Sequence, residues 1–118
     1  MKLRKIDCIM HFTEDVEASQ KFYTDILGLK LLWKDEKYKM TGLGLAETGA
    51  EIVLHQEPDI PQNEIHYLVD DVEKFCKEFK SCGGKIYTEP FDIRCGKCAV
   101  ISDNEGSGIS ILDLTKMK

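Results

Sequence analysis

The chain has 118 residues, enough to bury the core of one domain and too few for two independent ones. Its 21 acidic and 16 basic residues give a net charge of −5, which argues against nucleic acid or an anionic membrane as the main partner. Apolar residues make up 42% of the sequence, so we expect a folded protein and not a disordered one.

The first residues lack the apolar segment of a secretory signal, and no apolar run reaches the roughly 20 residues that span a bilayer. The cysteines are odd in number and irregularly spaced, which is typical of free thiols in a reducing compartment. We therefore predict a cytoplasmic protein. The five cysteines are Cys8, Cys76, Cys82, Cys95 and Cys98.

Two similar segments follow each other along the chain. Glu14-Asp15-Val16-Glu17 recurs 56 residues later as Asp70-Asp71-Val72-Glu73, and in each copy a glycine stands 13 residues after the second acidic residue, at Gly28 and Gly84. Such self-similarity indicates that one structural unit is used twice. Chance similarity between two βα units of a ferredoxin-like domain is the alternative.

Each copy predicts the same first two elements. An extended run over 6–13 or 64–70 leads to an Asp that can cap a helix, and the glycine at 28 or 84 ends that helix in the left-handed conformation. The apolar face of each helix follows from a period of 3.6 residues. The predicted faces are Val16, Tyr23, Ile26 and Leu27 in the first helix and Val72, Phe75, Cys76 and Phe79 in the second.

Three strands are predicted after each helix, which gives the order βαβββ twice and an α+β fold. We expect module 1 over 1–56, a linker over 57–63 that contains Pro58 and Pro61, and module 2 over 64–118. The predicted strands are Leu29–Lys34, Lys39–Ala46, Glu51–Gln56, Lys85–Thr88, Lys97–Ser102 and Gly108–Leu114.

Several short motifs, each weak alone, become specific through their order and spacing. They are Asp15-Val16, Phe22-Tyr23 and Leu27-Gly28-Leu29 in the first copy, and Val69-Asp70-Asp71-Val72, Gly83-Gly84 and Asp103-Asn104-Glu105-Gly106 in the second. Together they resemble the vicinal-oxygen-chelate superfamily of glyoxalase I, bleomycin- and fosfomycin-resistance proteins and extradiol dioxygenases. Asn104 replaces the proline that this family usually has there. The resemblance implies curved mixed sheets around a central cavity, often across a dimer.

The resemblance also implies a divalent metal held from four strand positions by His, Gln or Glu. By spacing, these positions are Cys8, Val53, Glu64 and Ser110. Val53 has no donor atom and Ser110 is a poor ligand, whereas Glu64 is a typical ligand and Cys8 a soft one once ionised. A catalytic site needs about three protein ligands and an open position. The usual metal site is therefore not preserved.

Strand alternation places His66 on the face of Glu64, and His55 on the face of Val53. Cys8, His55, Glu64 and His66 could then rebuild a Zn²⁺ or Ni²⁺ site. Alternatively, His66 and Glu64 pair beside a wet cavity while Cys8 fills the core.

Further residues are candidates for contact with a ligand. Trp33, Tyr38 and Phe91 could stack on a planar molecule, and Arg94 could meet an anionic group. His11 has the opposite parity and is expected under a helix or at a strand end. Cys95-Gly96-Lys97-Cys98 precedes a predicted strand, unlike a redox motif at a helix start. The predicted ligand-binding residues are Cys8, Met10, Trp33, Tyr38, Val53, His55, His66, Phe91, Arg94 and Ser110.

Fold resemblance does not assign a function, so alternatives of different classes stay open. We favour a protein without a cofactor that sequesters an aromatic or apolar ligand in its cavity. The alternative is an atypical Zn²⁺- or Ni²⁺-dependent lyase or isomerase in which Glu64 serves as ligand or general base. A sensor domain that signals through a partner is a third possibility. Open sheet edges also favour a homodimer.

Overall fold

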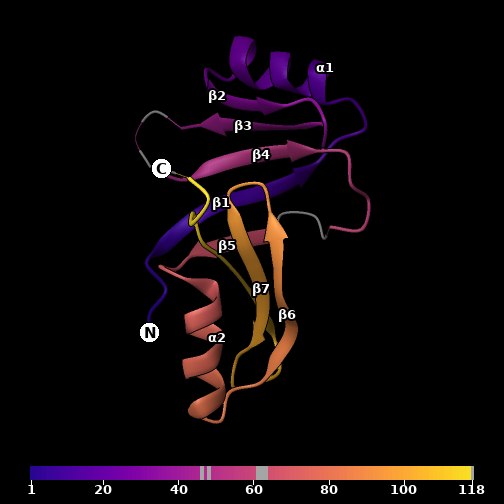
Figure 1. Cartoon of the computed structure of the whole chain (residues 1–118). Helices are drawn as coiled ribbons and strands as arrows, with labels where there is room; N and C mark the ends of the chain where they lie inside the picture. The colour runs from indigo at the N-terminus through magenta and orange to yellow at the C-terminus, as the bar shows by residue number, and fades with distance from the viewer. Residues whose placement is uncertain (46, 48, 61–63, 118) are drawn as a thin grey trace. The chain divides into compact units, whose positions relative to one another are not determined.

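The computed structural model describes residues 1–45, 47, 49–60 and 64–117. The chain forms two compact units: the N-unit is Asp7–Ile65, and the C-unit joins Met1–Ile6 to His66–Lys118. Strands and helices follow the order βαβββ twice along the chain (Figure 1). The predicted α+β fold with two βαβββ modules is thereby confirmed.

The N-unit sheet has the strand order β2-β3-β4-β1. β1 runs parallel to β4, and the other neighbours are antiparallel. α1 packs against β3 and β4 and continues into a π-helical segment, η1. The elements are β1 (Lys5–Phe12), α1 (Val16–Lys21), η1 (Phe22–Ile26), β2 (Lys30–Asp35), β3 (Met40–Gly44) and β4 (Glu51–His55).

The C-unit sheet repeats this pattern with the order β5-β8-β7-β6. β5 runs parallel to β8, and the other neighbours are antiparallel. α2 packs against β6 and β7, as Figure 1 shows. The elements are β5 (Glu64–Leu68), α2 (Val72–Ser81), β6 (Ile86–Ile93), β7 (Gly96–Ser102) and β8 (Gly108–Leu112).

Both predicted helix caps are present. The carboxylate of Asp15 accepts the amide of Ala18 at 3.1 Å, and that of Asp71 accepts the amide of Lys74 at 3.0 Å. Each Asp has an extended backbone, so its side chain folds back over the first turn and satisfies an amide that has no partner within the helix.

The helix ends follow the prediction in the N-unit only. Gly28 has a φ of 78° and ends the first helical segment as expected. In the C-unit Gly83, with a φ of 87°, takes the left-handed conformation, so the prediction of Gly84 for this role was wrong. A side chain at Gly84 would collide with the ring of Phe79, so the second glycine serves close packing instead.

The predicted apolar face of the first helix is wrong in part. Val16 is buried, but Ile26 and Leu27 are 69% and 54% exposed. The amide of Leu27 bonds to the carbonyl of Phe22 five residues back, and this wider π turn rotates later residues away from the core. The face predicted for α2 is confirmed, because its residues pack in one cluster with Val69, Ala99, Ile101 and Ile111.

Most strand bounds agree with the prediction within two residues, and β6 is the exception. It runs to Ile93, well beyond the predicted end at Thr88, and includes Pro90. The pairing of β6 with β7 is irregular between Thr88 and Phe91, and such an interruption accommodates a proline that cannot donate to the ladder. Ala46, the predicted end of one strand, and residues 61–63 of the predicted linker, with Pro61, lie outside the described residues.

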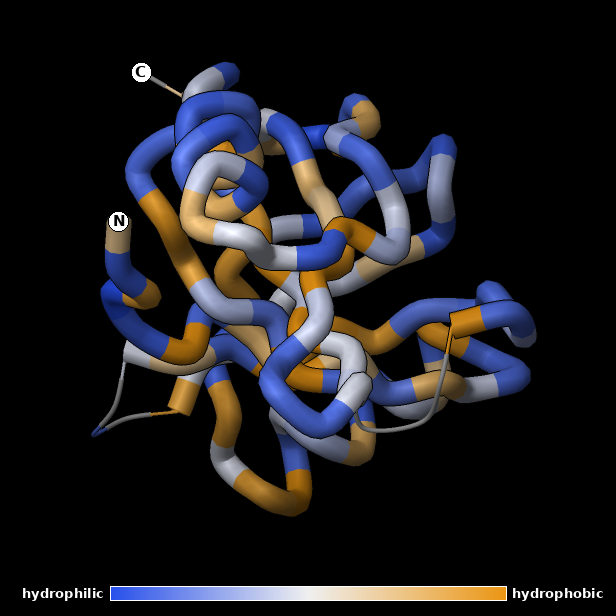
Figure 2. Tube along the Cα trace, turned by 90° about the horizontal axis from the view of Figure 1, so that it is seen from below, coloured by the Kyte–Doolittle hydropathy of each residue, from blue (hydrophilic) through white to orange (hydrophobic). Residues whose placement is uncertain are grey.

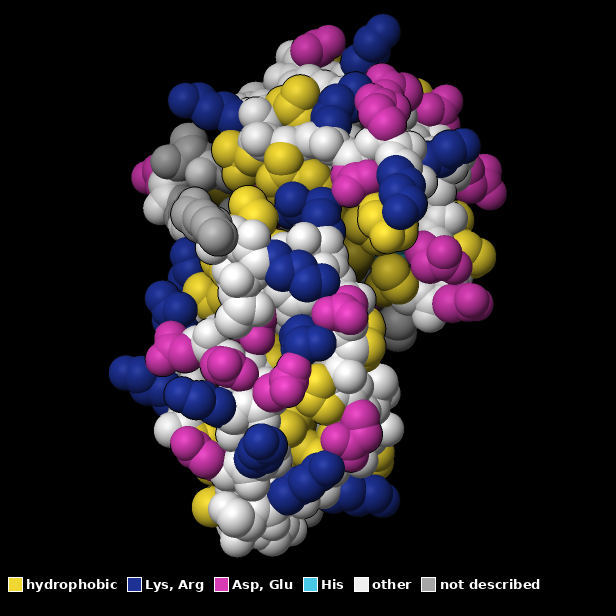
Figure 3. Space-filling model, in the orientation of Figure 1, with side chains coloured by type: hydrophobic (Ala, Val, Ile, Leu, Met, Phe, Trp, Pro, Cys, Tyr) yellow, Lys and Arg dark blue, Asp and Glu magenta, His cyan; other side chains and the backbone are white. Residues whose placement is uncertain are grey.

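Polar and apolar residues alternate over short distances along the trace (Figure 2). Within the described part of the chain, no helix has the length and apolar character that crossing a membrane requires. On the face seen in Figure 3, side chains of both charge signs are interspersed.

Candidate ligand-binding face

Parallel rows of side chains cross the N-unit sheet on the face that points away from α1 and η1. Alternation along β1 places His11 on the helix side, where its ring lies 6.3 Å from that of Tyr23 in η1, as predicted. Met10 and Phe12 therefore point to the opposite, helix-free face. Strand register defines its rows as Gly44, Glu51 and Cys8; Trp33, Gly42, Val53 and Met10; and Asp35, Met40, His55 and Phe12.

Trp33 is held in a defined position on this face. Its indole lies over Gly42, where any side chain would collide with the ring. Its Nε1–H donates to Glu51 Oε1 at 2.6 Å, and this hydrogen bond fixes the orientation of the indole ring. A β-bulge between Leu31 and Trp33 changes the direction in which the side chains of β2 point. The side chain of Leu32 lies over the second glycine, Gly44.

The middle of the face is apolar. Cys8, Met10 and Val53 form a buried cluster against which Trp33, Met40 and Ile60 pack. The thiol of Cys8 lies 3.9 Å from the Met10 sulfur. The strand positions of Cys8 and Val53 are those at which the resemblance requires metal ligands. An aliphatic side chain packed against a thioether does not fit a divalent metal.

The other positions that the resemblance implies add little donor capacity. Ser110 is buried on β8 opposite His66 on β5, and Glu64 is half-buried at the start of β5. A neutral hydroxyl is a poor ligand for Zn²⁺ or Ni²⁺. Within residues 1–45, 47, 49–60 and 64–117, no group of three or more His, Cys, Asp or Glu side chains is arranged to hold a metal ion. The residues present therefore do not fit the metal that the resemblance implies.

His55 has an unusual hydrogen-bonding state. Its side chain is 0% exposed, and its Nδ1 accepts the amide of Glu57 at 3.1 Å. A neutral imidazole that accepts at Nδ1 carries its proton on Nε2, so Nε2 is a donor in this state and not a metal ligand. Burial lowers the pKa of His55 below its ordinary value, while Glu57 and Glu64 oppose this effect and His11 adds to it.

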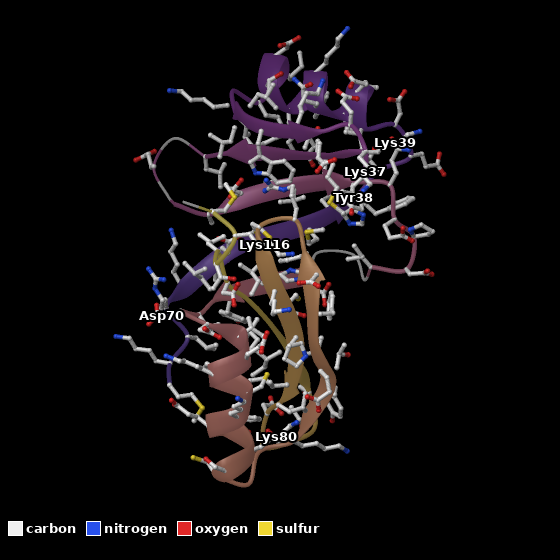
Figure 4. All side chains as sticks on the ribbon, in the orientation of Figure 1. Lys37, Tyr38, Lys39, Asp70, Lys80 and Lys116 are labelled. Atoms are coloured by element: carbon white, nitrogen blue, oxygen red, sulfur yellow. The ribbon has the colours of Figure 1, made fainter. Side chains whose placement is uncertain are left out.

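The remaining predicted ligand contacts lie in more exposed places. Tyr38 is 56% exposed in the turn between β2 and β3, with the Lys37 ammonium 5.2 Å from its ring (Figure 4). Phe91 on β6 is 44% exposed, and Arg94 is exposed in the turn between β6 and β7. Cys95 lies in that turn and no helix follows it, as predicted. The contribution of Tyr38, Phe91, Arg94, His66 and Ser110 to ligand binding stays a prediction.

Sequence reasoning missed the residues that position Trp33. Gly42-Leu43-Gly44 is unsuited to a phosphate loop, but its Gly-x-Gly alternation within a strand was a usable signal. Alternate glycines clear one face of a strand, and a large side chain on the neighbouring strand can lie across it. The role of Glu51 depends on the bulge in β2, which has no sequence signature here.

A hollow of about 150 Å³ lies beside α1 and the β2–β3 turn of the N-unit, and it shares Asp35 and Met40 with the last row of the helix-free face. The Lys34 ammonium at its wall pairs with Glu17 at 3.0 Å, so these two charges neutralise each other. The lining combines charged, polar and apolar side chains. It consists of Val16, Glu17, Lys34, Asp35, Glu36, Lys39, Met40, Thr41 and Gln56.

Known proteins resemble this chain in sequence and in fold. A probable lactoylglutathione lyase of Vibrio cholerae is 31% identical over 83% of this chain and 82% of its own length. A probable chloroplastic lactoylglutathione lyase of Arabidopsis thaliana is 30% identical over 93% of this chain, which spans only 36% of that protein. Methylmalonyl-CoA epimerase of Mycobacterium tuberculosis has the same fold, with a TM-score of 0.73 at 17% identity over 94% of this chain and 88% of its own.

The sequence profile of the Glyoxalase/Bleomycin resistance protein/Dioxygenase superfamily matches residues 5–111, nearly the whole chain. The match includes both copies of the repeat and every strand of the helix-free face. This chain belongs to the Glyoxalase/Bleomycin resistance protein/Dioxygenase superfamily.

Proposed function

We propose that this protein binds a small aromatic or apolar molecule on the helix-free face of the N-unit, without a metal ion. The observation that carries the proposal is the row Trp33, Gly42, Val53 and Met10, in which a fixed indole continues into apolar side chains. A flat ligand gains area by stacking on an indole whose conformational entropy is already lost.

Donor chemistry supports binding over metal-assisted catalysis. A metal-dependent lyase polarises its substrate through an ion held by several anionic or imidazole ligands. The N-unit offers an aliphatic side chain at Val53, and a protonated nitrogen at His55 Nε2. These groups favour an uncharged molecule over an ion.

The metal-dependent lyase or isomerase remains a second candidate because relatives are named lactoylglutathione lyase. In that case Cys8, His55, Glu64 and His66 would be its ligands, with Glu64 as ligand or general base. His55 would first have to exchange its Glu57 hydrogen bond, so that Nε2 loses its proton. Metal titration separates the two candidates.

Trp33 is the only tryptophan of the chain, so its fluorescence reports on this face alone. We would treat the protein with chelator, titrate it with naphthalene-sized aromatic compounds, and repeat the titration with Zn²⁺ or Ni²⁺ added. The expected result is a saturable change in Trp33 emission with the same dissociation constant in both series.

Trp33→Leu should weaken binding about tenfold in calorimetry, since aromatic contacts contribute roughly 0.5–1.5 kcal/mol beyond burial. Leu31→Ala is the matched control, because this exposed neighbour pairs with Leu43, whose side chain points to the helix side of the sheet. No saturable binding, or binding only with metal, would overturn the proposal. The metal-dependent result would favour the lyase or isomerase candidate.

A further inference from the structure

His55 lies one row from Trp33 on the helix-free face, next to Met40 and Phe12. Its ring meets that of Phe12 edge-on, with 6.0 Å between centroids. Along β4, His55 and Val53 are two residues apart, about 7 Å in a strand. The imidazole therefore lies within the length of a small aromatic molecule from the apolar row.

The Nε2 atom of His55 is buried and has no hydrogen-bond partner among the described residues. Because Nδ1 accepts the Glu57 amide, Nε2 carries the proton and needs an acceptor. A buried donor without an acceptor costs about 1–3 kcal/mol. Such a group in a folded protein calls for a specific explanation, such as an internal water or a bound ligand.

The C-unit shows that the fold does not need a polar side chain here. Leu112 pairs with Leu68 as His55 pairs with Phe12, at the equivalent place of the repeat. Leu112 is buried and packs in a wholly apolar cluster with Leu68 and Cys98. The fold therefore accepts leucine at this position. The imidazole of the N-unit introduces a buried donor that leucine does not have.

The charges near His55 limit the kind of acceptor. Glu57 and Glu64 both act on the imidazole electrostatically, and Glu51 lies in the row beside Val53. A carboxylate or phosphate brought to this place would be repelled by these acids and would lose its hydration. A carbonyl oxygen, amide oxygen or ring nitrogen meets neither penalty to the same degree.

Resting on the proposed function, we infer that the bound molecule carries a neutral hydrogen-bond acceptor which receives the Nε2 proton of His55. The ligand class is thus a flat apolar body with one carbonyl, amide or ring-nitrogen acceptor at its edge. His55 acts as the residue that selects this class from purely apolar molecules of the same size.

Quinoline and naphthalene form a matched pair, since they share size and shape and differ in one ring nitrogen. Their dissociation constants, measured through Trp33 emission, should favour quinoline about tenfold in the unmodified protein, the equivalent of one hydrogen bond. His55→Leu, which copies the C-unit, should remove this preference, so that the dissociation constants of quinoline and naphthalene agree within about twofold. His55→Gln keeps an N–H donor and should restore part of the preference.

Equal binding of the two compounds by the unmodified protein, as an internal water on Nε2 would produce, overturns this inference and leaves the proposed function standing. The same follows if His55→Leu keeps the preference. Tighter binding of 2-naphthoate than of quinoline refutes the neutral acceptor. No saturable binding of any of these probes overturns the proposed function itself, and this inference with it.

A second readout is independent of affinity. In proton–nitrogen NMR spectra, quinoline should move the His55 Nε2–H proton downfield, and naphthalene should not. An unchanged proton at saturating quinoline would overturn the inference even if the affinities differ.

Discussion

In the N-unit the side-chain oxygen of Gln56 accepts the first helical amide, that of Val16, at 3.1 Å. In the C-unit the carboxylate of Asp113 accepts the equivalent amide of Val72 at 2.7 Å. Both residues directly follow the last strand of their unit. The repeat therefore preserves a bond between strand end and helix start, while the group that makes it differs in charge.

Asp113 accepts more hydrogen bonds than Gln56, its counterpart in the N-unit. It is only 1% exposed, and it also accepts the amide of Lys97 at 2.9 Å and the hydroxyl of Thr115 at 2.7 Å. Gly96 is required beside it, because a side chain there would collide with the Asp113 carboxylate and carbonyl. A neutral amide suffices to hold one short helix, whereas a buried carboxylate joins a helix, a strand and the chain beyond β8.

Replacing Asp113 and Gln56 should give the largest difference in stability between the two units. Asp113→Ala leaves several buried donors without an acceptor and should reduce the free energy of unfolding by about 3 kcal/mol or more. Gln56→Ala removes one neutral hydrogen bond and should reduce it by about 1 kcal/mol. Urea unfolding of both variants measures the difference, and equal losses would contradict the assigned roles.

Acid should affect the two units differently. Burial opposes ionisation of Asp113, but hydrogen bonds from Val72, Thr115 and Lys97 outweigh this and hold the pKa of the carboxyl below its ordinary value. The unfolded state then binds the proton more readily, so the stabilisation is present above the unfolded pKa of about 4 and is lost as pH falls through the folded one.

Asp113→Asn should flatten the fall of unfolding free energy below about pH 4, measured against the unmodified protein. Gln56→Ala has no ionisable group to remove and serves as the control. A profile that Asp113→Asn leaves unchanged would show that the carboxylate does not determine acid stability.

The two units also differ at the strand position over which the Trp33 indole lies. Gly42 of the N-unit is paired with Val53, whereas Val100 occupies the equivalent place opposite Ser110 in the C-unit. Gly42→Ala should displace the indole, shift Trp33 emission and reduce the free energy of unfolding by about 1–3 kcal/mol.

Gly44→Ala is the matched control for this change. Its new methyl group would meet the end of the Leu32 side chain at 2.9 Å, and Leu32 is exposed and free to move. The loss of stability should be smaller, and Trp33 emission should stay unchanged. A similar emission shift in both variants would contradict the specific role of Gly42.

Removing the helix caps should give the smallest difference in stability between the two units. Asp15→Ala and Asp71→Ala each remove one bond to a first-turn amide, with donor–acceptor distances of 3.1 and 3.0 Å. Each should reduce the free energy of unfolding by about 1 kcal/mol. Urea unfolding should give losses that agree within about 0.5 kcal/mol, and a larger gap would mean that the units depend unequally on their caps.

Local patterns predicted the repeat, the helix caps and the parity of the strands. They failed where a regular period was interrupted, as at the π turn after Lys21 and the irregular pairing around Pro90. In both places an extra residue interrupts the regular repeat of the element, in a helical turn or in a strand pair. Dimerisation and cytoplasmic location stay predictions.

That Val53 cannot ligate a metal follows from its residue type alone, because the chemistry of an aliphatic side chain is independent of context. The two βαβββ modules could also be predicted from the sequence, because caps, glycines and alternation act over a few residues. The folded chain was needed to see that Glu51 and Gly42 fix Trp33, and that His55 presents a buried Nε2–H. These features depend on strand register and on a backbone amide near the side chain, and neither is encoded in a local pattern.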